Sequence, residues 1–355
     1  MPPQSIVLLI TPKAIFDFAN PDSSVGAILK NYESLLSRAN ETILIFAVGN
    51  SDHILMYRGR DFWNDNAEWA RTTDLKPVSE RVLTYYDIHR IIDTFRTNAA
   101  SLGIKIKVYD HIDSGSEFTV NNTFKYSLHS ECTANRWGMF DIRGELHSDA
   151  SRYASEPSGI PEGQWCGAFL ADQVAEYIAD LGFDGIMYDN QLGTRGRWRP
   201  GDGPGYTQVE ANAIDNFMRY SKTRFAGREL MWFDSYNSVP VEHDTFSFPT
   251  DGYQNFAYLI ASGFCAVADS QYPANLKSKL AIVHRPRILA TLDYVDPWYT
   301  YNSMTTYRTC SKQLEQTAID RRREIDGLMF FANDETGNLI PIKIIESFAS
   351  RFFAQ

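Results

Sequence analysis

The sequence lacks the patterns by which several large classes of protein are recognised. Its four cysteines are far apart and form no CxxC pair, so the spacing of a zinc site is absent and a reduced protein without disulfides is expected. No apolar run reaches the length that crosses a bilayer. We therefore expect no membrane partner for this chain.

The N-terminal residues also lack the features of an export signal. MPPQSIVLLI has no basic segment, and its apolar run of five residues is too short for a signal peptide. The sequence as it stands predicts a cytoplasmic protein, or a secreted protein from which an export signal has been removed.

Motifs for cofactor and nucleophile chemistry are absent as well. There is no GxGxxG, no phosphate-binding P-loop and no GxSxG elbow around a serine nucleophile. The formal net charge of −10 gives an acidic field that repels phosphate backbones. We therefore predict no cofactor, no resident metal and no nucleic-acid partner.

Alternating strand-like and helix-like segments run from one end of the sequence to the other, which indicates an α/β fold with a parallel sheet. We predict a (β/α)8 TIM barrel over residues 1–355 as a single domain, with a long insertion after strand 3 at 114–167 that forms a lid or cleft wall. The predicted strands are 5–11, 42–48, 104–110, 182–190, 229–233, 263–268, 287–292 and 326–331, and the predicted helices are 23–39, 78–102, 168–182, 208–225, 311–325 and 342–353.

A short phrase repeats along the chain, an apolar strand that ends in an aspartate. In a barrel of this kind the active site lies at the carboxyl ends of the strands, so aspartates there predict one acidic site. A single Asp would be explained as well by a turn or a helix N-cap. The seven aspartates are Asp52, Asp110, Asp189, Asp234, Asp269, Asp293 and Asp334.

Strand 4 carries the most specific motif. Gly182-Phe183-Asp184-Gly185 followed by Asp189 resembles the G-F-D-G-[apolar]-x-x-D phrase of many barrel glycoside hydrolases. The resemblance implies that the carboxylate ending strand 4, Asp189, is catalytic. Asp184 and Gly185 stand at the start of the strand, where we expect them to shape the turn.

Two groups of families sharpen this resemblance. Chitinase family 18 and endo-β-N-acetylglucosaminidase family 85 have a catalytic Glu where this chain has Gln191, and the W-Y-D-S segment of family 85 resembles Trp232-Phe233-Asp234-Ser235. Gln cannot donate a proton as a carboxylic acid does. In other barrel families the strand-4 Asp is the nucleophile and the acid lies on strand 5 or 6, which implies Asp234 or Asp269.

Glycoside hydrolysis needs two carboxylates that flank the bond, one to protonate the leaving oxygen and one to attack or to activate water. We predict that Asp189 is the nucleophile or transition-state-stabilising group, that Asp234 is the leading general acid and that Asp269 is the next candidate. The carbohydrate substrate is predicted to contact Asn190, Asp293, Tyr236, Tyr272, Trp298, Asp110, Arg195 and Asp334.

Two alternatives stay open at this point. Gln191 motivates a non-catalytic, carbohydrate-binding barrel like the chitinase-like lectins, since fold does not fix function. His53 and His111, with Asp52, Asp110 and Asp113, motivate a metal-dependent barrel hydrolase, although their spacing matches no standard signature. The sequence leaves the sugar, the linkage, the stereochemistry and the oligomeric state open.

Overall fold

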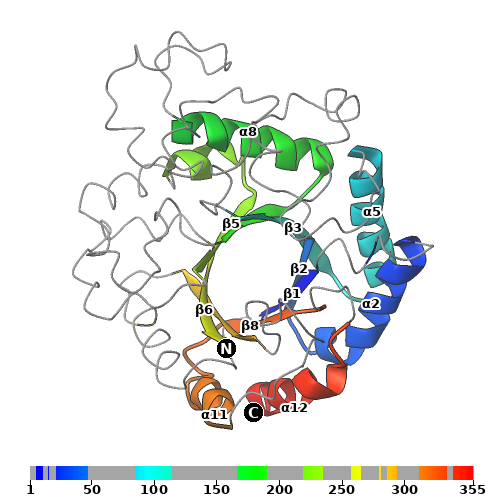
Figure 1. Ribbon diagram of the computed structural model, residues 1–355, viewed down its shortest axis with the longest axis vertical. Coiled ribbons are helices and arrows are strands. Elements are labelled where there is room, and N and C mark those ends of the chain that lie inside the picture. Colours follow the sequence, from blue (N-terminus) through cyan, green and yellow to red (C-terminus); the bar gives the residue numbers. More distant parts are fainter. Residues whose placement is uncertain are drawn as a thin grey trace, which may run out of the picture.

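The computed structural model of the chain describes residues 5–10, 15, 21–46, 85–113, 166–189, 219–234, 257–264, 280, 286–293, 312–333 and 339–354. Within these residues eight parallel strands form a closed barrel, in which each strand pairs with the next and β8 pairs with β1 (Figure 1). The strands are β1 Ser5–Ile10, β2 Glu41–Phe46, β3 Ile106–Asp113, β4 Gly185–Asp189, β5 Glu229–Asp234, β6 Tyr258–Phe264, β7 Arg287–Asp293 and β8 Gly327–Phe331. The predicted (β/α)8 TIM-barrel fold is confirmed, and residues 114–165 of the predicted insertion lie outside the described residues.

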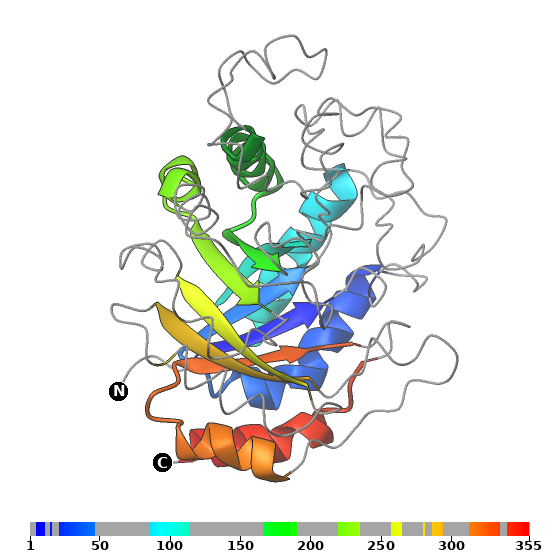
Figure 2. The same cartoon turned by 60° about the vertical axis from the view of Figure 1, so that its left-hand side comes forward.

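Helices surround the barrel, and each buries one apolar stripe against it. In the last helix Ile345, Phe348, Ala349 and Phe352 recur at helical spacing and are all buried. Figure 2 shows two of the helices, α11 and α12, packed side by side along the barrel wall. The helices are α2 Pro21–Leu36, α5 Tyr85–Ser101, α8 Cys166–Leu181, α11 Lys312–Asp320 and α12 Ile342–Phe353, and residues 219–224 are also helical.

Glycines end two of these helices, as their left-handed backbone allows. Gly103 follows α5 with φ of 72° and Gly182 follows α8 with φ of 82°. Behind Gly182 the chain turns at once into β4, and the N–H of Phe183 donates to the carbonyl of Ile178. None of the helices in the described part of the chain is long and apolar enough to span a bilayer.

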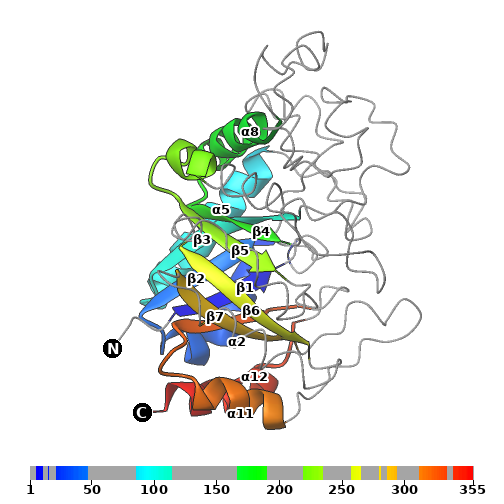
Figure 3. The same cartoon turned by 90° about the vertical axis from the view of Figure 1, so that its left-hand side faces the viewer.

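Alternation along each strand divides the buried side chains into two cores. On β1, Ile6 and Leu8 face the helices, whereas Val7 and Leu9 face the barrel interior. The strand arrows all point the same way (Figure 3), so the carboxyl ends of the strands share one end of the barrel. The interior core consists of Val7, Leu9, Ile43, Ile45, Tyr109, Met187, Met231, Tyr258, Ile260, Leu289 and Met329.

Two predicted strands lie elsewhere than expected. Strand 3 was placed at 104–110, but β3 runs to Asp113, because its last residues pair with β4 up to the partners Asp113 and Asp189. Strand 6 was placed at 263–268, but β6 spans Tyr258–Phe264, which pairs with both β5 and β7. The helix expected at 168–182 is α8, which begins two residues earlier, at Cys166.

Two glycines let neighbouring strands approach closely at the amino end of the barrel. A Cβ on Gly327 would lie 2.2 Å from the carbonyl oxygen of Ser5, and a Cβ on Gly185 would lie 2.5 Å from that of Glu229. Both obstacles are backbone atoms of a paired strand, which cannot swing aside as a side chain does. These positions therefore require glycine for steric reasons, although their backbone angles are ordinary strand values.

Gly327→Ala should lower the free energy of unfolding by about 3 kcal/mol, because the new methyl group forces β8 away from β1. The matched control is Gly26→Ala on α2, where the nearest atom is the side-chain oxygen of Asn98 at 3.3 Å. Alanine is the better helix former, so the control should be neutral or stabilising. Urea unfolding followed by circular dichroism measures both changes, and equal effects would contradict the steric explanation.

Candidate functional site

The interior of the barrel changes from apolar to polar towards the carboxyl ends of the strands. The stagger of a barrel places interior positions from alternate strands on one level. Two successive levels are apolar and almost entirely buried, one formed by Val7, Tyr109, Met231 and Leu289 and the next by Ile45, Met187, Ile260 and Met329. These two levels fill the barrel interior, so a binding site at the carboxyl ends of the strands can begin only above them.

Polar residues occupy some of the interior-facing positions above the apolar levels, where Leu9 of β1 is still apolar. His111 and Thr291 follow Tyr109 and Leu289 by two residues, which places them on the same face of β3 and β7. Continuing these series, Asp113 ends β3 and Asp293 ends β7, while Asp189 continues the series of Met187 on β4. Three aspartates therefore end their strands at interior-facing positions.

Asp113 and Asp189 are direct neighbours in the sheet. They are partners in the β3–β4 ladder, and both are the last residue of their strand. Neighbouring strands lie about 4.8 Å apart, so two partners on the same face are close together. From the sequence, Asp113 was predicted only as a member of a possible metal cluster, because strand 3 was expected to end three residues earlier.

Asp234, predicted as the leading general acid, ends β5 but belongs to the other series of positions. Two and four residues before it, Trp232 and Leu230 are buried in the core between barrel and helices. Its partner in the ladder is Ala261 of β6. Strand alternation thus places Asp234 at a helix-facing position, one residue beyond the interior-facing position of Phe233.

Asp110, predicted to end strand 3 and to contact substrate, lies within β3 and is fully buried. Its carboxylate accepts hydrogen bonds from the hydroxyl of Tyr177 on α8 at 2.6 Å and from the backbone N–H of His111 at 2.7 Å. It therefore links the barrel wall to α8. The expectation that Asp110 is a strand-end residue is wrong, because β3 continues for three more residues along β4.

Several other predicted residues lie outside the described part of the chain. The predicted acid Asp269 lies five residues beyond the described end of β6, and outside the described residues. The same holds for Gln191 and for seven predicted substrate contacts or site residues. These are Asn190, Arg195, Tyr236, Tyr272, Trp298 and Asp334, together with Asp52 of the strand-end series.

Asp184 has the turn-shaping position that the motif predicted. Its carboxylate accepts from the backbone N–H of Val108 at 2.9 Å and from the guanidinium of Arg96 at 3.0 Å. Arg96 also donates to the carbonyl of Gly182 at 2.6 Å. The G-F-D-G half of the strand-4 phrase thus fixes the entry into β4, at the end of the strand opposite to Asp189.

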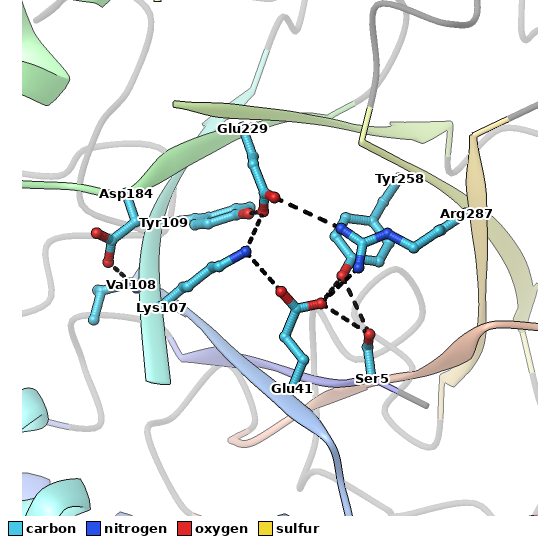
Figure 4. Close-up of polar contacts among 9 residues, drawn as sticks. All are labelled: Ser5, Glu41, Lys107, Val108, Tyr109, Asp184, Glu229, Tyr258 and Arg287. Atoms are coloured by element: carbon cyan, nitrogen blue, oxygen red, sulfur yellow. Dashed lines mark hydrogen bonds and ion pairs between the residues drawn. The ribbon is translucent and has the colours of Figure 1, made fainter. Parts of the chain in front are cut away.

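A second polar cluster lies at the amino end of the barrel (Figure 4). Lys107 bridges the carboxylates of Glu41 at 2.6 Å and Glu229 at 2.9 Å, and Arg287 reaches the same two groups at 2.8 and 3.6 Å. Two cations thus neutralise two anions in a closed ring. A cluster whose charges are satisfied internally offers a ligand little to bind, and the loss of one member would leave its partner's charge uncompensated.

Two tyrosines and a serine complete this cluster at the amino end of the barrel, which we call the basal cluster. Tyr258 donates from its hydroxyl to Glu41, and Tyr109 donates to Glu229. Ser5 donates to Glu41 at 3.1 Å. Burial raises the pKa of both phenols, and the neighbouring carboxylates raise it further, so both stay protonated donors.

The pKa of Glu41 reflects this environment. Burial by itself would raise it, but hydrogen bonds from Lys107 and Tyr258 and the charge of Arg287 outweigh burial and lower the pKa from 4.5 to about 2. Burial would likewise lower the pKa of Lys107, but its hydrogen bonds to Glu41 and Glu229 prevail and raise it. Both groups therefore keep their charges across the neutral range.

Glu41→Gln should lower the free energy of unfolding at pH 7 by on the order of 1–2 kcal/mol. Because the folded-state pKa lies below the unfolded value, the stabilisation by Glu41 is present above pH 4.5 and is lost as the pH falls towards 2. The gap between wild type and variant should therefore narrow on acidification. Denaturant titrations at several pH values measure the gap, with the surface variant Glu346→Gln as control, and a constant gap would contradict the assignment.

Tyr177→Phe should destabilise the fold by about 1–3 kcal/mol, because it removes one partner from the buried carboxylate of Asp110. The control is Tyr220→Phe, whose hydroxyl donates to Asp172 at 3.1 Å. Asp172 is partly exposed and keeps Arg224 at 2.5 Å, so this loss should be smaller. Thermal unfolding measures the loss of stability in both variants. A larger loss for Tyr220→Phe would contradict the stabilising role of the hydrogen bond between Tyr177 and Asp110.

No metal site is formed by the side chains of the described residues, since three His, Cys, Asp or Glu do not come together among them. The sequence grouped His111 with Asp110 as metal ligands. Asp110 is instead engaged by Tyr177 in the layer outside the barrel wall, so it does not share a face with an interior-facing His111.

No protein-family model matches the chain, and no curated protein matches it by sequence. The chain is similar in fold to solved structures. It is similar to the C-terminal domain of a "putative chitinase" from Desulfitobacterium hafniense DCB-2, with a TM-score of 0.53 and 9% identity, and 100% of both chains is covered.

Two further solved structures are similar at lower scores. A chitinase from Bacteroides thetaiotaomicron has a TM-score of 0.47 and 11% identity, with 99% of this chain and 96% of that chain covered. The endo-fucoidan hydrolase P5AFcnA of glycoside hydrolase family 107 has a TM-score of 0.46 and 11% identity, with 99% and 91% covered. The likeness to the Desulfitobacterium domain concerns the fold alone at 9% identity, and the fold of this chain is a closed parallel barrel.

Proposed function

We propose that this protein is a glycoside hydrolase that cleaves a glycosidic bond in an oligo- or polysaccharide by paired-carboxylate catalysis. The observation that carries the proposal is the pairing of Asp113 with Asp189 at the carboxyl ends of β3 and β4. Both occupy interior-facing positions above an apolar, closed barrel. Carboxylates at this end of a barrel are where its chemistry is usually found.

Asp189 is the nucleophile or the group that stabilises positive charge on the sugar. Asp113 is the leading partner as general acid, ahead of Asp234, because it shares the interior-facing series with Asp189 and is its ladder partner. The proposed chemistry requires one protonated acid beside one ionised carboxylate, and neighbouring positions in the sheet are where such a pair can be held. Retaining enzymes hold their two carboxyl groups about 5–5.5 Å apart and inverting enzymes about 6.5–9.5 Å apart, so the stereochemistry of the product reports this separation.

Other predicted residues extend the site around this pair. Asp293 ends β7 at an interior-facing position and is proposed to bind hydroxyl groups of the sugar. The remaining proposed contacts come from the sequence and keep their predicted roles, with aromatic rings for stacking and polar groups for hydroxyls. They are Asn190, Arg195, Tyr236, Tyr272, Trp298 and Asp334.

Asp189→Asn should reduce turnover of the true substrate by at least about a thousand-fold, because it removes an essential carboxylate and keeps the side-chain volume. A glycan panel assayed for released reducing ends identifies the substrate, and circular dichroism shows whether the fold is kept. The exposed Asp180→Asn on α8 is the control and should remain active. Undiminished turnover by Asp189→Asn would refute the role of Asp189.

The same assay ranks the candidates for the general acid. Asp113→Asn should be as damaging as Asp189→Asn, whereas Asp234→Asn should retain more activity because strand alternation gives it a helix-facing position. A hit that binds the wild-type chain tightly but is never hydrolysed would favour the non-catalytic carbohydrate-binding barrel. An anomer-resolved product spectrum on any hydrolysed hit then distinguishes retention from inversion.

A further inference from the structure

Two polar residues lie on the interior level just below Asp189. His111 is on β3, two residues before Asp113, and Thr291 is on β7, two residues before Asp293. β3 and β7 are on opposite sides of the barrel, since the strands follow each other in order around it (Figure 1). The two residues therefore belong to opposite walls at the upper limit of the apolar core.

Thr291 is buried completely, and its hydroxyl has no hydrogen-bond partner within the described part of the protein. A buried hydroxyl without a partner is costly and is rare in native proteins. Valine has nearly the same shape and would fill this position without that cost. A hydroxyl at an interior-facing position directly below strand-end aspartates is therefore well placed for a partner that arrives with a ligand.

His111 differs from the interior residues below it because it is partly exposed, whereas Tyr109 and Met187 are fully buried. Its position is held from outside the barrel. The ladder between β2 and β3 ends at the partners Ile45 and Tyr109, and the N–H of His111 instead donates to the carboxylate of Asp110. Tyr177 of α8 holds that carboxylate in turn.

We infer that His111 and Thr291 form the polar floor of the site and hydrogen-bond hydroxyl groups of the sugar on which the carboxylates act. This inference rests on the proposed function. An imidazole and a hydroxyl can each both donate and accept a hydrogen bond, as a sugar hydroxyl does, whereas ionised carboxylates only accept. Asp110 and Tyr177 are positioning residues that fix the backbone of His111.

The decisive variant is Thr291→Val, measured for glycan binding and for stability. Binding of a glycan hit should weaken by roughly 5–10-fold, the effect of one lost hydrogen bond, while the unfolding midpoint stays the same or rises. The matched control is Ser221→Ala, which removes another fully buried hydroxyl without a partner among the described residues, from the helical segment 219–224 outside the barrel. It should match the effect on stability and leave binding unchanged. Equal binding by the two variants would overturn the inference.

His111 is tested by two substitutions and by deoxy-sugars. His111→Ala should weaken binding by at least about 10-fold, and His111→Gln, which can still donate and accept, should recover part of that loss. A site that hydrogen-bonds a hydroxyl discriminates strongly against the analogue that lacks it. One deoxy analogue of the hit should therefore bind wild type poorly and lose little more in Thr291→Val or His111→Ala. Additive losses for every deoxy analogue would contradict direct contact.

Binding is measured by calorimetry in the Asp189→Asn background, so that hydrolysis does not interfere. Binding without any hydrolysis by the wild type would refute the proposed function. The contact of Thr291 with the sugar would then be tested by comparing binding in Thr291→Val and Ser221→Ala. Hydrolysis by a wild type whose Thr291→Val and His111→Ala variants bind normally would overturn the floor alone. A glycan panel in which nothing binds would overturn both.

Discussion

Closure of the parallel ladder is the constraint on which the rest of this structure depends. Once β8 pairs with β1, every strand has one face towards the interior and one towards the helices, and a shift by one residue would exchange them. The roles of the charged residues follow from which of these two faces each residue occupies. Glu41 and Glu229 reach the basal cluster because they stand at interior-facing positions, and Asp110 is tied to α8 because it does not.

The two ends of the barrel use polar residues in different ways. At the amino end, cations and anions alternate around a ring and satisfy one another, with two phenols and a serine as additional donors. At the carboxyl end, the ladder brings aspartates side by side. Like charges at such positions cost stability, which proteins accept at sites that act on a ligand. The basal cluster lies at the other end of the barrel from these aspartates.

The sequence was sufficient to predict the architecture because the pattern of apolar runs and amphipathic helices is strong. It was not sufficient to fix the strand ends. Residues 258–264 and 263–268 both read as short apolar runs, and pairing with β5 and β7 selects the first. β3 continues past Asp110 because β4 offers partners for His-Ile-Asp, which a propensity argument cannot see.

The candidate site was predicted in part for the same reason. Asp189 and Asp293 could be found from their place after an apolar run, but the neighbour of Asp189 depends on the true end of β3. The basal cluster was missed because its members come from six strands that are far apart in the sequence. A signal was available: Glu41, Lys107, Glu229 and Arg287 are charged residues that open or nearly open a strand, where a buried run would otherwise begin.

The position of the basal cluster affects which residues of this fold can be substituted independently. Apolar levels separate it from the strand-end aspartates, so the two groups share no partner. Substitutions at the two ends should then combine additively, with losses of stability at one end offset at the other. Residues around Asp189 can therefore be substituted while Gly327, Lys107 and Arg287 keep the barrel closed.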